Sequence, residues 1–266
     1  MIAEIISVGT ELLLGDIVNT NAQYLAKHLA ALGIEVHYQT VVGDNPDRIK
    51  NVLDVAYTRA DMTIMTGGLG PTKDDLTKER IAAYFGKQLI LDQKAVDRMA
   101  NTLKKVQKQS LLQSLIKQAY VPTDSVILYN HNGLAPGCIK ENQERICILL
   151  PGPPKEMEPM FETYCIPYLK KISEQVLVSV TIQLLDFDHA AVIEVGEAPV
   201  ADRLAELLDL TNPTVATYTK EDGNLVRITA RAANHTKALE KIQPVLTKCK
   251  ERIGEHLIQR IEEDKG

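Results

Sequence analysis

Short apolar runs alternate along the first 170 residues with stretches in which apolar residues recur every three or four positions. The runs predict strands over residues 3–8, 35–42 and 62–66. The recurring stretches predict helices over residues 21–32, 46–60 and 75–85, and Gly33 and Gly86 end the first and last of these. This alternation is typical of an α/β domain with a doubly wound, mostly parallel sheet.

The pattern becomes less regular after residue 90. Residues 93–118 are rich in Lys, Gln and Leu and predict helix with a break near Ser110. Short strands are predicted over 126–129, 137–140 and 145–150, the last two joined by a turn over 141–144. A closing helix is predicted over 153–171, with kinks at Pro159 and Pro167 because proline cannot continue the hydrogen-bond ladder.

A second, smaller α+β domain is predicted because the pattern of strands and helices changes between residues 172 and 176. Its pattern gives a strand over 176–187, a helix over 199–208, strands over 214–219 and 225–232 with a turn at 221–224, and a helix over 236–253. We therefore predict two domains, residues 1–173 and residues 174–266.

Charge and composition narrow the classes of partner. The 266-residue chain has a formal net charge of -5 and a pI near 5.7, and its Lys and Arg are scattered among acids. This pattern argues against nucleic acid or an anionic membrane as the main partner. A phosphate-bearing substrate would need backbone N–H groups, a helix N-terminus or a metal ion.

The cysteines and the N-terminus predict a reduced, cytoplasmic protein. Cys138, Cys147, Cys165 and Cys249 form no C-x-x-C pair, so we read them as small buried apolar side chains rather than zinc ligands. The N-terminus has neither a basic region nor a small-residue cleavage site, and no apolar run reaches the roughly 20 residues of a membrane helix.

Loops punctuated by Gly and Pro follow the predicted parallel strands. They span residues 9–21, 43–45 and 66–75, and two more such loops follow at 132–137 and 150–157. In an open parallel sheet, ligands bind outside the carboxyl ends of the strands. We therefore expect these loops to converge on a binding site.

The loop TGGLGPTKDD, residues 66–75, suits a phosphate. Gly67, Gly68 and Gly70 can take positive φ and let a ligand approach the backbone, while Pro71 fixes the turn before the helix. The helix N-terminus would offer free N–H groups and a positive dipole end. The GG-x-G cluster is not the spaced dinucleotide fingerprint, and no G-x-S-x-G or H-E-x-x-H motif points to an α/β-hydrolase or a zinc protease.

Two adjacent carboxylates in this loop oppose a bare phosphate. Asp74 and Asp75 would repel it, and a divalent cation between carboxylate and phosphate oxygens resolves the conflict. Mg²⁺ commonly binds through one or two carboxylates plus substrate phosphates. Asp44, after the second strand, is a further acidic ligand candidate. The sequence thus predicts a metal site at Asp44, Asp74 and Asp75.

Structural interpretations of the same residues remain open. Thr72 and Asp75 resemble a capping box, which needs no ligand. Asn21 is equally consistent with a helix N-cap, and dipole compensation at a helix start explains Glu156 as well as metal binding does. His131, beside a turn, is interpreted as a solvated side chain.

The ordered set of motifs resembles one protein family. The segment GTELLLGDIVNTNAQYLAKHLAALGI, the Gly43–Asp44 turn, TGGLGPTKDDLT, NGLAPG and LPGPPKEM resemble the amino-terminal domain of the CinA family, within the MoaB/MogA/MoeA group of molybdopterin-binding folds. That resemblance covers residues 2–171. The segments VGE and NPTVATYTKEDGNLVRITARA look like the KH-like domain of the same family, a name that there implies shape rather than RNA binding.

The resemblance implies a metal-dependent pyrophosphatase acting on ADP-ribose or a related dinucleotide such as FAD. It also implies Mg, Mn or Co as cofactor, a monovalent cation beside it, and a homo-oligomer. Longer members carry a further domain that deamidates nicotinamide mononucleotide. The sequence ends at Gly266, and no segment resembling that domain is found, so deamidation is not expected.

The family motifs carry over to numbered residues of this chain. The catalytic and metal-binding candidates are Asp44, Asp74 and Asp75. The nucleotide side is expected to be lined by Gly9, Thr10, Glu11, Asn19 and Asn21. The phosphate side is expected to be lined by Thr66, Gly67, Gly68, Gly70 and Thr72. The pocket would be closed by Pro136, Gly137, Gly152 and Glu156.

Two departures from the family pattern favour alternatives. Leu115 replaces a polar residue in the run LIKQAYVP, and Leu134 replaces a threonine in NGLAPG. Both changes are expected near the pocket, where they would either alter the substrate or weaken catalysis. The alternatives are a molybdopterin- or nucleotide-binding protein without hydrolysis, and an oligomeric interaction protein.

Overall fold

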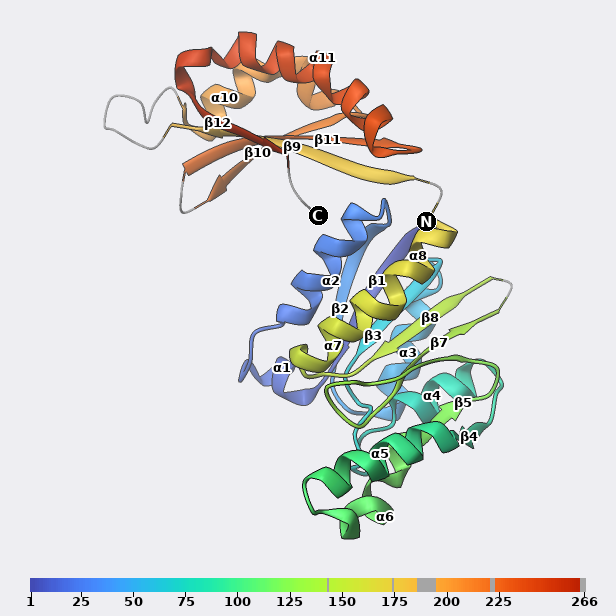
Figure 1. Ribbon diagram of the computed structural model, residues 1–266. Helices are drawn as coiled ribbons and strands as arrows, with labels where there is room; N and C mark the ends of the chain where they lie inside the picture. Colours follow the sequence, from blue (N-terminus) through green and yellow to red (C-terminus); the bar gives the residue numbers. More distant parts are fainter. Residues whose placement is uncertain (143, 174, 186–194, 221–222, 264–266) are drawn as a thin grey trace. The chain divides into compact units, whose positions relative to one another are not determined.

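The computed structural model describes residues 1–266 except 143, 174, 186–194, 221–222 and 264–266. The chain forms two compact units, one of Met1–Ala30 and Ile34–Ile172, the other of Ala31–Gly33 and Ser173–Gly266 (Figure 1). Parts of three predicted features lie outside the described residues: the end of the strand over 176–187, and positions within the turns over 141–144 and 221–224. Residue 174, where the second domain is predicted to begin, also lies outside them.

The first unit is built on a six-stranded sheet in the order β2-β1-β3-β8-β7-β6. Its strands are β1 (Ile2–Val8), β2 (Glu35–Val42), β3 (Met62–Thr66), β6 (Val126–Leu128), β7 (Gly137–Glu141) and β8 (Ile146–Leu150). β1 pairs in parallel with β2 and β3, and β3 pairs in parallel with β8. β7 and β6 add antiparallel. The sheet is mixed and mostly parallel, which confirms the predicted fold class.

Helices cover both faces of this sheet. They are α2 (Thr20–Ala31), α3 (Pro46–Ala56), α4 (Thr77–Tyr84), α7 (Pro154–Met160) and α8 (Ile166–Ile172), while the short α1 (Thr10–Leu14) follows β1 and buries no residue. α3 and α4 bury Leu53 and Ile81 in one cluster with Ile6 and Met65 of the strands. On the other face, Figure 1 shows α2 beside the α7–α8 segment, where the Tyr24 ring meets Phe161 edge to face.

A small subdomain separates α4 from β6. It contains β4 (Leu89–Leu91), α5 (Gln93–Lys105), α6 (Leu112–Leu115) and β5 (Tyr120–Pro122), with 3-10 turns at Gln109–Leu111 and Ile116–Ala119. The predicted break near Ser110 comes earlier, because α5 ends at Lys105 and Gln107 has a left-handed φ of 56°. The antiparallel β4–β5 pair was not predicted, since each strand has three residues and shows no periodicity.

Besides the 93–118 stretch, three helices of the first unit differ from prediction by more than one residue or by a break. α3 ends at Ala56 rather than at residue 60. The closing helix is three pieces, α7, a π-helical turn at Phe161–Cys165 and α8, and π-helical turns are a common way to bend a helix. α4 begins at Thr77, not at Asp75. Asp75 therefore lies in the preceding loop, outside the first helical turn.

The second unit is an antiparallel sheet in the order β10-β11-β9-β12. Its elements are β9 (Val176–Leu184), α10 (Glu197–Leu204), a 3-10 turn (Ala205–Asp209), β10 (Thr214–Lys220), β11 (Gly223–Ala232), α11 (His235–Ile253), a 3-10 turn (Glu255–Leu257) and β12 (Ile258–Glu263). Both helices lie on one face of the sheet (Figure 1) and share a core with it, as Val200, Ile182 and Ile242 show. This confirms the α+β class. β12 was not predicted because most of its side chains are exposed.

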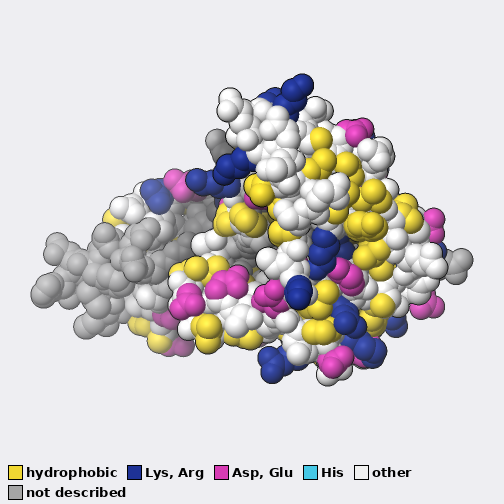
Figure 2. All heavy atoms as spheres, turned by 90° about the horizontal axis from the view of Figure 1, so that it is seen from below, with side chains coloured by type: hydrophobic (Ala, Val, Ile, Leu, Met, Phe, Trp, Pro, Cys, Tyr) yellow, Lys and Arg dark blue, Asp and Glu magenta, His cyan; other side chains and the backbone are white. Residues whose placement is uncertain are grey.

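Surface and core properties agree with several expectations. All four cysteines are free and buried, and burial raises the pKa of the Cys138 thiol to about 11. On the face drawn in Figure 2, basic and acidic side chains are interspersed. Among the described residues, no helix combines the length and the apolar character that crossing a bilayer requires.

Candidate functional site

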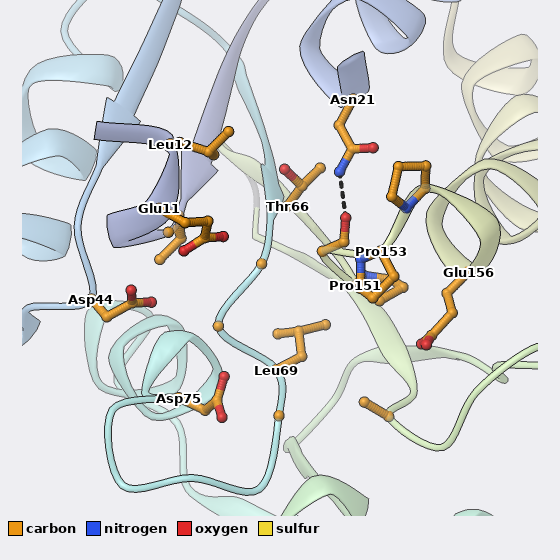
Figure 3. Close-up of a pocket in the computed structure, with 18 of the residues that line it drawn as sticks. Glu11, Leu12, Asn21, Asp44, Thr66, Leu69, Asp75, Pro151, Pro153 and Glu156 are labelled. Carbon is orange, nitrogen blue, oxygen red and sulfur yellow. Dashed lines mark hydrogen bonds between the residues drawn. The ribbon is translucent and has the colours of Figure 1, made fainter. Parts of the chain in front are cut away.

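A cavity of about 650 Å³ lies at the carboxyl ends of the parallel strands of the first unit (Figure 3). Val8 at the end of β1, Asp44 after β2, Thr66 at the end of β3 and Pro151 after β8 all line it. This is the place where an open parallel sheet binds its ligands.

Most of the predicted site residues line this one cavity. They are Gly9, Glu11, Asn19, Asn21, Asp44, Thr66, Gly67, Gly68, Gly70, Asp74, Asp75, Gly152 and Glu156. Four predicted residues are not among its lining residues. Thr10 and Thr72 donate hydrogen bonds to Asp44 and Asp75, two carboxylates that do line it. Pro136 lines a second cavity, and Gly137 is buried at the start of β7.

The glycine-rich loop has the backbone conformation that the sequence suggests at two positions. Gly67 and Gly68 have φ of 98° and 67°, which confirms their predicted positive φ. A Cβ on Gly67 would lie 2.1 Å from the carbonyl oxygen of Val8. Gly70 is outside the left-handed region, so that prediction is wrong; its Cβ would instead lie 2.4 Å from Asp75 Oδ2. The absence of a Cβ at Gly70 therefore leaves room for the Asp75 carboxylate where Thr72 holds it.

The start of α4 is tied to this loop. The Thr77 backbone N–H donates to the Gly68 carbonyl at 3.2 Å, and Thr77 Oγ1 donates to the Gly67 carbonyl at 3.1 Å. The first amide of the helix is therefore engaged, which corrects the expectation that it is free for a phosphate. At this wall the cavity is lined by Gly67, Gly68, Leu69 and Gly70 of the loop.

Two of the three predicted metal ligands are held by neighbouring threonines. Asp44 Oδ2 accepts hydrogen bonds from Thr10 N and Thr10 Oγ1, both at 3.0 Å. Asp75 Oδ2 accepts from Thr72 N at 2.9 Å and from Thr72 Oγ1. Among the described residues, Oδ1 of each carboxylate accepts no hydrogen bond. The Thr72–Asp75 pair is thus a loop contact and not a capping box on α4.

The carboxylates fit a metal site that a substrate completes. No group of three His, Cys, Asp or Glu among the described residues lies close enough to hold a metal by itself. Carboxylate oxygens are nevertheless the ligands that Mg²⁺ prefers, and it takes one or two of them together with substrate phosphates. The donor chemistry suits such a shared site rather than a cage made by protein alone.

Asparagines at the start of α2 form the opposite wall. Asn19 Oδ1 accepts from the backbone N–H of Ala22, so Asn19 is the N-cap and the cap interpretation of Asn21 is wrong. Asn21 Nδ2 donates to the Gly152 carbonyl at 2.7 Å (dashed line in Figure 3). The Asn21 Oδ1 atom is buried without a partner in the described structure. One bond of Asn21 therefore joins α2 to the loop after β8.

Glu156 points into the cavity from the first turn of α7 (Figure 3). Its Oε2 accepts from Asn130 Nδ2 at 2.6 Å, and a Cβ on Gly133 would lie 2.2 Å from the same oxygen. Glu156 thus receives both a hydrogen bond and a close backbone contact from the 130–135 segment, besides lying at a helix start.

Apolar residues of the cavity were not predicted. Ile17 and Val18 are 53% and 82% exposed, and Leu12, Leu69 and Pro153 also line the cavity. The sequence signal that could have revealed them is the cluster of apolar residues within 12–18, which lies in the loop over residues 9–21. Large exposed apolar side chains at a cavity mouth are typical of surfaces that a ligand covers.

The two departures from the family pattern differ in position. Leu134 lines the cavity, as expected. Leu115 packs instead against the cluster that holds Met99 and Leu103 of α5, and it lines neither this cavity nor the second one, which Pro136 lines. Its apolar side chain therefore contributes to the core of the small subdomain, and the expected effect on the pocket is not supported for Leu115.

A buried lysine lies behind the glycine loop. Lys78 is 4% exposed, and its Nζ donates to the carbonyl of Gln118, a cavity residue, at 2.7 Å. Burial lowers the pKa of the Lys78 ammonium from 10.5 to about 8. Helical position alone gives no sign of this burial, so sequence analysis missed it.

Replacing Lys78 with Met is expected to remove a pH-dependent part of the stability. Between pH 8 and 10.5 the folded chain releases this proton while the unfolded chain keeps it, so wild-type stability gains with rising pH. The free energy of unfolding of the wild type relative to Lys78→Met should therefore rise from pH 7.5 to pH 10. Chemical unfolding of both proteins at several pH values measures it, and a flat difference would contradict the buried charge.

Comparison with known proteins agrees with this geometry. Residues 4–171 match the family described as probable molybdopterin binding domain, and residues 191–258 match the damage-inducible protein CinA KH domain. The fold and these matches define a molybdopterin-binding-type domain followed along the chain by a smaller CinA KH domain. The chain belongs to the CinA family.

Individual relatives support this assignment. The chain is 46% identical over 258 residues to a competence-damage inducible protein of Clostridium beijerinckii and 49% identical over 258 residues to a CinA-like protein of Kosmotoga olearia. Both alignments cover 97% of this chain but only 61% and 60% of those proteins, so it spans about three fifths of their length. The crystal structure of a CinA of unknown function from Thermoplasma acidophilum is 36% identical, with a TM-score of 0.57, over 62% of this chain and 96% of that one.

Proposed function

We propose that the first unit is a metal-dependent hydrolase that cleaves the phosphoanhydride bond of ADP-ribose or of a related dinucleotide such as FAD. The observation that carries the proposal is one cavity that joins the backbone of Gly67 and Gly68 to the carboxylates of Asp44, Asp74 and Asp75. The glycine backbone gives phosphates room to approach. The carboxylates would repel phosphates unless a cation lies between them.

The charge of the cavity supports a cation in the reaction. Its acidic lining residues are Glu11, Asp44, Asp74, Asp75 and Glu156, and no Lys or Arg of the described chain lines it. A diphosphate alone would meet like charge at short range, which costs several kcal/mol where solvent is excluded. A divalent cation held by Asp44 and Asp75 would offset that repulsion, polarise the phosphoanhydride and favour deprotonation of an attacking water.

The chain's own groups bind and orient the substrate. The loop backbone at Gly67 and Gly68 lets the diphosphate approach closely, because neither residue carries a Cβ. Thr10 and Thr72 fix the two carboxylates by donating to their Oδ2 atoms. Ile17 and Val18 can cover the bound ligand and limit the access of bulk water. Orientation and exclusion of water are the parts of catalysis that this geometry supports.

A panel of dinucleotides tests the function. ADP-ribose, FAD and NADH are incubated with the full chain and Mg²⁺, Mn²⁺ or Co²⁺, and the mononucleotide products are separated and measured. We expect hydrolysis of at least one substrate, with AMP and ribose 5-phosphate formed from ADP-ribose, and loss of turnover in EDTA. Absence of product from every combination would reject the proposal.

A binding protein without hydrolysis is the second candidate. Leu134, which lines the cavity where a threonine hydroxyl is usual in the family pattern, favours it. Calorimetry that shows tight binding of ADP-ribose in EDTA, with no product after hours, would support this alternative. Turnover in the panel would exclude it.

Other expectations stay proposals. They are a homo-oligomer, a cytoplasmic location, a monovalent cation in the site, and the absence of nucleic acid and membrane partners. Light scattering of the full chain would decide the oligomeric state.

A further inference from the structure

A second cavity of about 320 Å³ lies beside the first. One side is α5, and the other is the segment from Tyr129 to Pro136, part of which also forms the wall of the main cavity. Gly133 and Leu134 line both cavities. The full lining is Ala95, Arg98, Met99, Asn101, Thr102, Lys105, Tyr129, Asn130, His131, Gly133, Leu134 and Pro136.

The two cavities have opposite charge. The second is lined by Arg98 and Lys105, with His131 beside them, and by no Asp or Glu of the described chain. In the described part of the chain, the charged residues that line the main cavity are all acidic. In a chain with a net charge of -5, a cavity whose charged lining residues in the described chain are all basic favours an anion.

Arg98 is held in place with donors to spare. Its Nη2 donates to the carbonyl of Asn130 at 3.2 Å and lies 3.1 Å from His131 Nδ1. Its guanidinium also lies 5.7 Å from the centre of the Tyr129 ring. Neither Nε nor Nη1 of Arg98 donates a hydrogen bond within the described chain. A positioned guanidinium with unused N–H groups suits an oxyanion.

We propose that this second cavity is a subsite for a phosphate-type oxyanion, bound directly by Arg98 and Lys105 without a bridging metal ion. Asn101 and Thr102 line it too and can supply neutral donors. Its volume is about half that of the main cavity, which suits one anionic group better than a whole dinucleotide.

The wall between the cavities is fixed by Asn130. Its backbone carbonyl accepts from Arg98, while its side-chain Nδ2 donates to Glu156 Oε2 and to the Ala135 carbonyl. Asn130 thus contacts Arg98, a basic residue of the second cavity, and Glu156, an acidic residue of the first. The anion has two possible sources: a phosphate on a dinucleotide that extends past Gly133 and Leu134, or a separate small anion.

Inorganic pyrophosphate in EDTA tests the subsite. EDTA removes the metal that a diphosphate would need in the acidic cavity, so the remaining binding reports on the basic one. Calorimetry on the full chain should show binding that weakens about tenfold in Arg98→Gln and in Lys105→Gln, the loss expected for a charge-assisted hydrogen bond. Lys104→Gln is the matched control, because Lys104 directly precedes Lys105 on α5, is exposed and does not line the cavity.

The outcomes separate clearly. Circular dichroism checks that each variant is folded, and exposed Lys105 provides a variant that removes no buried group. No binding by the wild type in EDTA, or unchanged binding in both cavity variants, would overturn the proposal. Because binding rather than turnover is measured, an inactive enzyme leaves this test intact, so its failure is distinguishable from failure of the hydrolase proposal.

A second arm identifies the source of the anion. If the subsite takes a substrate phosphate, which rests on the proposed function, ADP-ribose with an added 2′-phosphate should bind more tightly than ADP-ribose. Arg98→Gln should then abolish that gain. If the subsite takes a separate anion, pyrophosphate and ADP-ribose should bind at the same time, and the 2′-phosphate should give no gain.

Discussion

Replacing Asp74 and Asp75 together with Asn is expected to lower metal-dependent hydrolysis of ADP-ribose by at least about 100-fold. Mutation of residues that only hydrogen-bond to metal ligands already lowers metal affinity or activity about 10- to 100-fold, and these carboxylates are proposed as the ligands themselves. Asn keeps the shape of Asp and can still accept the hydrogen bond from Thr72 N, so the loop should keep its conformation. Asp44→Asn is expected to act similarly, since Asp44 lines the same cavity and is held by Thr10 in a matching way. Initial rates against metal concentration measure both effects.

Asp47→Asn is the matched control for these variants. Asp47 lies three residues from Asp44, in the first turn of α3, is exposed and does not line the cavity. Its replacement changes the net charge as Asp44→Asn does and should leave the rate unchanged. Full turnover in the Asp74/Asp75 double variant would remove these residues from the mechanism, whereas an equal loss in Asp47→Asn would indicate a general charge effect.

Local patterns predicted the sheet and most helices of the first unit well. The apolar run that forms β3 ends in glycines, and its five residues are all buried between flanking strands. Burial of both faces makes such a run distinct in the sequence. The start of α4 was misplaced because Asp75 bonds to Thr72 instead of entering the helix. Asp75 lies beside Gly70 in the folded loop, a neighbourhood that no local pattern shows.

The candidate site was predictable where neighbouring residues of one type, such as paired carboxylates or glycines, indicate a role without the rest of the fold. The adjacent carboxylates and the paired glycines of residues 66–75 are local signals, and they lie together in the main cavity. The role of Asn21 depends instead on Gly152, which lies 131 residues away in the sequence. The second cavity joins α5 to the 129–136 segment, about 30 residues later, so its charge pattern exists only in the folded chain.

Gly67→Ala is expected to destabilise the first unit by about 3 kcal/mol or more. Gly67 has φ of 98°, a conformation that costs an L-residue about 1–2 kcal/mol. The new Cβ would also lie 2.1 Å from the carbonyl oxygen of Val8, at the end of β1. That strand is paired on both sides, with β2 and β3, so the carbonyl cannot move away without disturbing the sheet. Guanidinium unfolding followed by circular dichroism measures the loss.

Gly15→Ala separates the two causes. Gly15 has φ of 79°, and a Cβ there would meet no atom within 4 Å, so only the conformational cost of about 1 kcal/mol applies. A much larger loss of unfolding free energy in Gly67→Ala than in Gly15→Ala would show that close packing against β1 fixes the loop over residues 66–75. Equal losses would contradict that conclusion and indicate that the loop tolerates a displaced backbone. In the first case, ADP-ribose binding should weaken in Gly67→Ala even under conditions where the variant stays folded, because the loop must shift away from Val8.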